Sequence, residues 1–251
     1  MAWVQSESAS FRARHESGEA EDARAVLLAL ERARAELAPR FASRPEGLTV
    51  VLHPTPTALA MSNPLLPLVW LLAAPSARRY ITGWAGRQDL HVLSPAALRE
   101  RAANLPGSRE MLGRSAACLY ARRVIDEVNP DLHRVAGPIR IRRSARWAWL
   151  IEGAARWFGG QTDHARAAIA RRLYEGGRPR FPPGLRDAAL LGGTVIDLLV
   201  ARAGPDAAVR LVSRLHPRGP DAALAWAFGD RSLSRIEAEW RAHLAALASG
   251  R

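Results

Sequence analysis

Residues 147–160 read WAWLIEGAARWFGG, and this stretch decides how the rest of the chain is interpreted. Its apolar residues recur at helical spacings, which predicts an amphipathic helix: Trp149, Leu150, Ala154, Trp157 and Phe158. A single carboxylate, Glu152, lies in the middle of this run and is followed by Gly153. Burying a carboxylate without a partner costs several kcal/mol. Glu152 therefore either faces solvent, forms an ion pair or coordinates a metal.

The composition is that of a globular protein with enough apolar material for a sizeable core. The chain has 251 residues, of which 48% are hydrophobic and 24% charged, so it forms one large domain or two small ones. Its one cysteine, Cys118, excludes an intramolecular disulfide and a cysteine-based zinc site.

Nothing in the sequence predicts a membrane span. The longest apolar run, residues 65–74, is shorter than the roughly 18 residues needed and contains Pro67. The N-terminus, MAWVQSESAS, lacks the basic and apolar regions of a signal peptide. We therefore expect a cytoplasmic protein, or an exported one if translation starts elsewhere.

The formal net charge of +12 raises the question of an anionic partner. All the cationic side chains are arginines and there is no lysine, which together with the abundant alanine indicates GC-rich codon usage rather than selection for phosphate contacts. The densest basic cluster leads directly into the tryptophan-rich helix: Arg140, Arg142, Arg143 and Arg146. We expect this cluster to be a solvated basic face, with binding of nucleic acid or an anionic surface as the alternative.

The N-terminal half alternates strands and helices. We expect strands at residues 10–14, 48–53, 80–84 and 89–93, where short β-rich runs are bounded by turn residues. Helices are predicted at residues 19–37, from the Ser94–Pro95 start, and at 108–128. Residues 57–79 are expected to be irregular because Pro64, Pro67 and Pro75 interrupt them.

The remainder of the chain, from Gly160 onward, is predicted to be helical. The expected helices cover residues 162–174, 184–203, 205–215, 220–228 and 232–247, and Gly192 and Gly193 permit close helix packing. Strands come first and helices follow, which predicts an α+β fold. We expect a small N-terminal mixed or antiparallel sheet with one long helix, followed by a mainly helical half.

Residues 149–155, WLIEGAA, resemble the second-helix signature P-x-W-L-x-E-G-x-A-x-Y of the gluzincin metallopeptidases, specifically the bacterial peptidase MA-like proteins. Residues 195–204 and the ending AFGDRSLSRIEAEW at 227–240 are similar to the closing helices of that family. The resemblance covers nearly all of the chain. It implies a single zincin-like unit, with an α+β subdomain at 1–130, a helical subdomain at 131–251 and a cleft between them.

In such enzymes two histidines four residues apart hold Zn²⁺, and the Glu of WLxEG is the third ligand. The Glu of HExxH is the general base for the metal-bound water. Glu152 matches the third-ligand position. The resemblance places HExxH over residues 117–121, to within one helical turn, so that Ala117 and Ala121 stand at the ligand positions and Cys118 at the base.

The histidines that zinc binding needs are missing from this chain. No two of its seven histidines lie four residues apart: His15, His53, His91, His133, His164, His216 and His243. We therefore expect no zinc, no other cofactor and no peptidase activity, and a cleft that binds a protein or peptide or acts as a scaffold. Glu152 is expected to pair with Arg122, Arg123 or Arg146, and Cys118 to be a small buried thiol.

Two alternatives involve a rebuilt site. His133 or His91 could approach Glu152 in space and restore a metal site. An active hydrolase could instead use Glu152 as an acid/base residue, assisted by His133 or Cys118.

Overall fold

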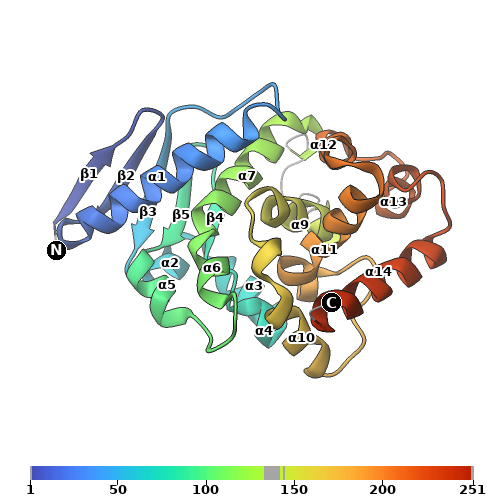
Figure 1. The fold of residues 1–251 in the computed structure, drawn as a ribbon. Coiled ribbons are helices and arrows are strands. Elements are labelled where there is room, and N and C mark those ends of the chain that lie inside the picture. Colours follow the sequence, from blue (N-terminus) through green and yellow to red (C-terminus); the bar gives the residue numbers. More distant parts are fainter. Residues whose placement is uncertain (1, 133–141, 144, 250–251) are drawn as a thin grey trace.

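The computed structural model describes residues 2–132, 142–143 and 145–249. The fold is α+β, with a small sheet built early in the chain and a helical half built from the rest (Figure 1). The five strands are β1 (Trp3–Glu7), β2 (Phe11–Glu16), β3 (Leu48–His53), β4 (Gly83–Ala85) and β5 (Asp89–Leu93). Their order is β1-β2-β3-β5-β4; β2, β3 and β5 are parallel, and the edge strands β1 and β4 are antiparallel to their neighbours. The expected small mixed sheet is confirmed.

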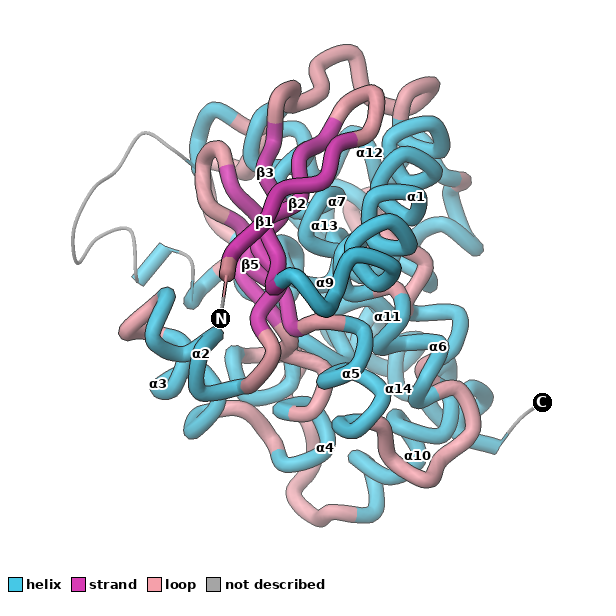
Figure 2. The backbone as a smooth tube through the Cα atoms, turned by 90° about the vertical axis from the view of Figure 1, so that its left-hand side faces the viewer, coloured by secondary structure: helices cyan, strands magenta, loops and turns pink. Residues whose placement is uncertain are grey.

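One face of the sheet forms part of the main core. Alternate residues of the two central strands are at most 1% exposed, as expected from the two-residue period of a strand: Leu48, Val50, Leu52, Leu90 and Val92. Helices α1 (Ala20–Leu37) and α7 (Ser115–Val128) pack on this side. In Figure 2 they lie to the right of the strands, whereas α2 (Pro56–Ser62) and α3 (Leu66–Leu72) lie below and to the left.

The helical half packs on α7 through α9 (Ala148–Phe158), and α11 (Leu185–Ala203) packs in turn against α9. The other helices of the described residues are α4 (Pro75–Arg78), α5 (Pro95–Arg101), α6 (Ser108–Gly113), α10 (Arg166–Tyr174), α12 (Pro205–Ser213), α13 (Pro220–Ala227) and α14 (Leu233–Ser249). Short 3₁₀ turns occupy Ser17–Glu19, Pro130–Leu132 and Thr162–His164. A single cluster of buried apolar side chains extends from the sheet through α7 and α9 to α14. None of the described helices is both long and apolar enough to cross a bilayer.

The strand at β1 was not predicted from the sequence. Its residues are exposed or half-buried, so the strand has no buried face and shows no apolar alternation. It is held by its pairing with β2, in which Trp3 is opposite Glu16 and Glu7 opposite Arg12.

The prediction that residues 57–79 are irregular is wrong. This segment contains α2, α3 and α4, and each has a proline in its first turn: Pro56, Pro67 and Pro75. Proline is well suited to that position because the first N–H groups of a helix have no intrahelical acceptor. The prolines therefore start three short helices here.

Two further boundaries differ from the prediction. The strand expected at 80–84 is reduced to β4, because Tyr80 and Ile81 form a buried turn in which their N–H groups donate to Ala77 and Arg78. The long helix expected at 108–128 is divided into α6 and α7 at Arg114, next to Gly113. Glycine has a low helix propensity, which favours a break there.

Candidate functional site

Two glycine contacts fix the orientation of α9. A Cβ added at Gly153 would lie 2.3 Å from the carbonyl carbon of Gly192 in α11, so the two helix backbones touch at this point. At the C-terminal end of α9, a Cβ at Gly159 would lie 2.7 Å from the Cα of Cys118 in α7. Real Cβ atoms do not approach other atoms so closely, and both positions therefore require glycine. With Gly153 directed at α11, the neighbouring Glu152 is directed at α7.

The carboxylate of Glu152 meets an arginine of α7. Arg122 donates from Nη1 to Glu152 Oε1 at 2.7 Å, and its Nε donates to both oxygens of Asp126 at 3.1 and 3.2 Å. On the other side, Arg156 lies one turn further along α9, with its Nη2 3.8 Å from Glu152 Oε2. Asp126, Arg122, Glu152 and Arg156 thus form a row of alternating charge whose formal sum is zero.

Of the three arginines considered as partners of Glu152, one forms an ion pair with it in the structure. Arg122 is confirmed as a partner of Glu152. Arg123 instead donates to the carbonyl oxygen of Arg87 and to Glu127. Arg146 lies with its guanidinium against Gly219.

Arg122 is held in the charged form by its neighbours. Burial alone would lower the pKa of Arg122, but the carboxylates of Asp126 and Glu152 raise it above the usual arginine value. The side chain of Arg122 is 25% exposed and that of Glu152 is 40% exposed. This half-buried pair removes the cost of an isolated carboxylate among tryptophans.

The charged row continues into a hydrogen-bond chain that ties α9 to α6. Arg156 donates to the side chain of Gln161, and Gln161 Nε2 donates to the carbonyl oxygen of Met111 at 2.6 Å. Gln161 is fully buried, so these bonds satisfy its amide. Arg156 and Asp126 were not predicted from the sequence. Their spacing of four residues from Glu152 and from Arg122 is the signal that could have found them.

The positions predicted to carry the lost HExxH motif are apolar and buried. Ala117, Cys118 and Ala121 are each at most 5% exposed. Burial raises the pKa of the Cys118 thiol to about 11, so it remains protonated at neutral pH. Cys118 is thus the buried free thiol that the sequence favoured, and this geometry does not support a role as a nucleophile.

Of the histidines considered as replacement ligands, the described one, His91, is engaged by other side chains. His91 lies on the sheet, where its Nδ1 is 2.9 Å from Nε2 of His53, its Nε2 is 3.2 Å from Asp89, and its ring stacks on Trp84 at 4.2 Å. His133 lies outside the described residues. Within the described residues, no histidine forms a hydrogen bond or ion pair with Glu152, and no three His, Cys, Asp or Glu side chains are grouped to hold a metal.

This arrangement leaves Glu152 poorly suited to acid/base chemistry. Both of its oxygens face guanidinium groups, from Arg122 and Arg156. A general base needs a lone pair directed at the substrate proton. The site has the properties of a structural ion-pair network.

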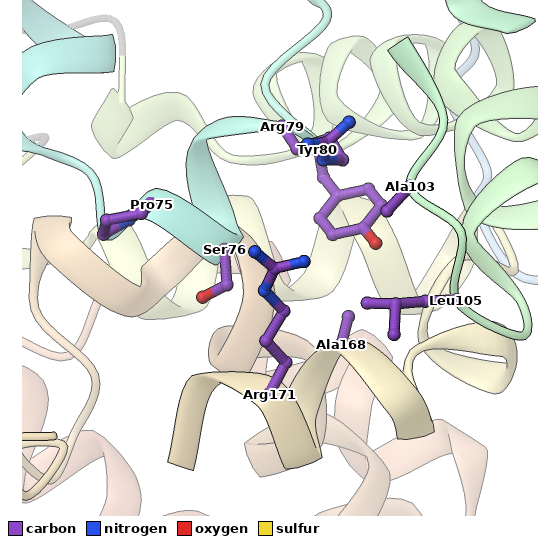
Figure 3. A pocket seen from close by; sticks show the side chains of 8 residues that line it. All are labelled: Pro75, Ser76, Arg79, Tyr80, Ala103, Leu105, Ala168 and Arg171. Carbon is purple, nitrogen blue, oxygen red and sulfur yellow. The ribbon is translucent and has the colours of Figure 1, made fainter. Parts of the chain in front are cut away.

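A second basic site lies beside the start of α9. A cavity of about 380 Å³ is lined by four arginines together with Asp131, Trp147, Leu215, His216, Pro217 and Gly219. The four are Arg142, Arg143, Arg146 and Arg214. By contrast, the cavity between α4 and α10 measures about 20 Å³, which is room for about one water molecule. Figure 3 shows Arg171 rising from α10 toward Ser76, with Tyr80 and Leu105 beside it.

Comparisons with protein families, with curated proteins and with solved structures give no match for this chain. A function has to be inferred from the chain's own residues. The informative features are the ion-paired carboxylate on the WLIEG helix and the arginine-lined cavity.

Proposed function

We propose that the chain is a gluzincin-like domain of the peptidase MA-like type that holds no zinc and hydrolyses no peptide bonds. It serves to bind a protein or peptide or as a scaffold. The observation that carries the proposal is the 2.7 Å ion pair between Arg122 and Glu152, the residue that matches the third zinc ligand of that family.

The charges around Glu152 support a replacement of the metal by arginine. A zinc ion would bring two positive charges to this position. Arg122 and Arg156 bring the same charge, opposite Glu152 and Asp126. A cation approaching Glu152 would be repelled by the guanidinium of Arg122 and would have to displace it. The carboxylate is therefore retained as part of the α7–α9 contact.

The ion pair between Arg122 and Glu152 also supports placing the HExxH motif one residue later than residues 117–121. Arg122 directly follows the stretch 117–121. If HExxH is laid over residues 118–122, its second histidine falls on the residue that touches Glu152. Cys118 then takes the first ligand position and Leu119 that of the general base. The Leu119 side chain is directed at the edge strand β4, where a Cβ at Gly83 would lie 2.7 Å from its Cδ1.

Rebuilding the motif tests this proposal. The triple variant Cys118→His, Leu119→Glu, Arg122→His is expected to bind stoichiometric zinc, and an added Glu152→Gln change is expected to abolish that binding. The matched control places the motif in the earlier register, as Ala117→His, Cys118→Glu, Ala121→His, and should bind none. Circular dichroism verifies that each variant is folded. A folded triple variant without zinc would contradict the proposed origin of the site.

The alternative of a hydrolase centred on Glu152 has its own test. Peptide and ester substrates are incubated with the wild type and with Glu152→Gln. We expect no turnover by either protein. Turnover that disappears in Glu152→Gln would favour the hydrolase instead.

A second candidate function is the binding of a phosphate- or carboxylate-bearing small molecule in the arginine-lined cavity. Arg142, Arg146 and Arg214 are exposed around a space of about 380 Å³. Guanidinium groups bind such anions through paired N–H donors. Calorimetric titration with pyrophosphate should give binding that weakens in Arg214→Gln and is unchanged in Arg235→Gln on α14. Binding of DNA of any sequence with a steep salt dependence would instead favour a nucleic-acid binder.

A further inference from the structure

The helix α3, with the sequence LPLVWLL, has no polar side chain on any side. Leu66 is buried, and the indole of Trp70 is partly buried and donates to the carbonyl oxygen of Ile81 at 2.9 Å. Most of the other side chains of α3 are exposed, and so are Met61 in α2 and Leu65 just before α3. They form what we term the α2–α3 apolar surface, with exposed fractions in parentheses: Met61 (83%), Leu65 (51%), Leu68 (52%), Val69 (40%), Leu71 (71%) and Leu72 (50%).

A surface of this kind needs a covering partner. A helix that is apolar all round is normally buried in a core or in lipid, and contiguous apolar patches on a protein mark interaction sites. None of the six side chains lines either of the cavities described above. In Figure 2, α2 and α3 lie at the periphery of the molecule. The surface thus lies at the periphery of the described part of the chain.

The charged residues that directly follow α3 in the sequence are arginines. Between Glu46 and Asp89 the sequence contains no aspartate or glutamate, and its charged residues are Arg78, Arg79 and Arg87. Leu185 and Arg186 at the start of α11 adjoin the end of α3, because the N–H of Ala74 donates to the carbonyl oxygen of Arg186 at 2.9 Å. Leu185 is 44% exposed and the side chains of Arg78 and Arg186 are exposed as well.

Glu175, a carboxylate that contacts α4, is already engaged. It accepts hydrogen bonds from the backbone and hydroxyl of Ser76 in α4 and pairs with Arg171. Exposed Arg78 and Arg186 thus lie on the segments that adjoin the end of α3, and their charge complements an anionic partner.

We propose that the α2–α3 apolar surface docks the protein onto an anionic lipid bilayer. The leucines and Met61 enter the boundary between head groups and acyl chains, and Arg78 and Arg186 meet lipid phosphates. A second copy of the chain would add further arginines to this side of the molecule. This inference goes beyond the proposed function and does not depend on the absence of zinc.

Vesicle co-sedimentation tests the proposal. Wild-type protein is expected to bind vesicles of phosphatidylcholine with phosphatidylglycerol, and to bind more weakly to phosphatidylcholine alone or at raised salt. Leu68→Ser and Leu71→Ser should each lower the partition coefficient by about fivefold, because each removes an exposed leucine from the lipid interface. Leu28→Ser on α1 is the matched control, since Leu28 is 53% exposed, and should bind as the wild type does.

Three results would overturn the proposal. The first is no sedimentation of wild-type protein with the anionic vesicles, and the second is equal binding to both vesicle types. The third is a dimer in analytical ultracentrifugation that Leu71→Ser converts to monomer, which would assign the surface to a second copy. Unchanged circular dichroism of the serine variants confirms that a loss of binding reflects the surface itself.

Discussion

Replacing Arg122 by methionine removes the guanidinium shared by Glu152 and Asp126 and keeps an unbranched apolar side chain. Charge-assisted hydrogen bonds contribute about 1.5–3 kcal/mol each, whereas an exposed ion pair contributes less than about 1 kcal/mol. Because Arg122 is 25% exposed and Glu152 40% exposed, the loss should lie between these limits. We expect the free energy of unfolding to fall by about 2 kcal/mol.

The Glu152→Gln change, made with and without Arg122, measures the interaction between these two side chains separately from their other contacts. In the wild type it weakens the hydrogen bond from Arg122 and should cost about 1 kcal/mol. In the Arg122→Met background it relieves the repulsion between Glu152 and Asp126, which have lost their shared cation. There we expect it to be neutral or stabilising, so that the coupling energy between Arg122 and Glu152 is about 1 kcal/mol or more.

Urea unfolding followed by tryptophan fluorescence gives the four free energies of this cycle. The control is Arg235→Met, which removes an arginine that is 70% exposed and 3.6 Å from Glu239, and which should cost less than about 0.5 kcal/mol. If Glu152→Gln had the same cost with and without Arg122, the two side chains would not be coupled. The account of Glu152 as an ion-paired residue would then be refuted.

Three further predictions concern the packing and the buried titratable groups. Gly153→Ala should destabilise the fold by about 3 kcal/mol, because its Cβ would lie 2.3 Å from the backbone of Gly192. The control is Gly113→Ala, whose Cβ would have no neighbouring atom within 4 Å and which should stabilise the fold by at most about 1 kcal/mol. If urea unfolding showed Gly153→Ala to be more stable than Gly113→Ala, the packing of α9 on α11 would be contradicted. Burial and the neighbouring His91 lower the pKa of His53 to about 4, below its ordinary 6.5. The unfolded chain therefore binds a proton at this residue more tightly than the folded chain does. The contribution of His53 to the free energy of unfolding is complete above pH 6.5 and falls as the pH drops toward 4. Between pH 7.5 and 5 the His53 contribution should fall by about 2 kcal/mol in urea titrations, and His53→Gln should remove that slope; an unchanged slope would argue against a neutral buried His53. Cys118 should react with Ellman's reagent at pH 8 on the order of 100-fold more slowly in the folded than in the unfolded protein, because burial raises its pKa; equal rates would exclude a buried thiol.

The elements that bury an apolar face could be predicted from the sequence. The strands at Leu48–His53 and Asp89–Leu93 have the predicted bounds, because their β-rich composition reflects the pleat and the burial directly. The strand β1 could not be predicted in this way, since pairing with β2 holds it and its side chains remain in solvent. The prolines of α2, α3 and α4 act by their position in the first helical turn, which local composition does not reveal.

For the candidate site, electrostatics predicted a partner for Glu152 but not which arginine it would be. That choice depends on which side of α7 packs on α9. The contact between Gly159 and Cys118 sets this side, and it involves residues 41 positions apart in the chain. Arg122 is one turn beyond Cys118 on α7 and therefore meets Glu152, whereas Arg123 is directed at Glu127 and the carbonyl oxygen of Arg87.

The zinc content of the untagged protein tests the central claim most directly. The protein is incubated with excess zinc, dialysed and examined by elemental analysis, with Glu152→Gln treated in parallel. If Arg122 neutralises Glu152 in place of a metal, zinc remains far below stoichiometric in both proteins. Stoichiometric zinc in the wild type that is lost in Glu152→Gln would contradict the account.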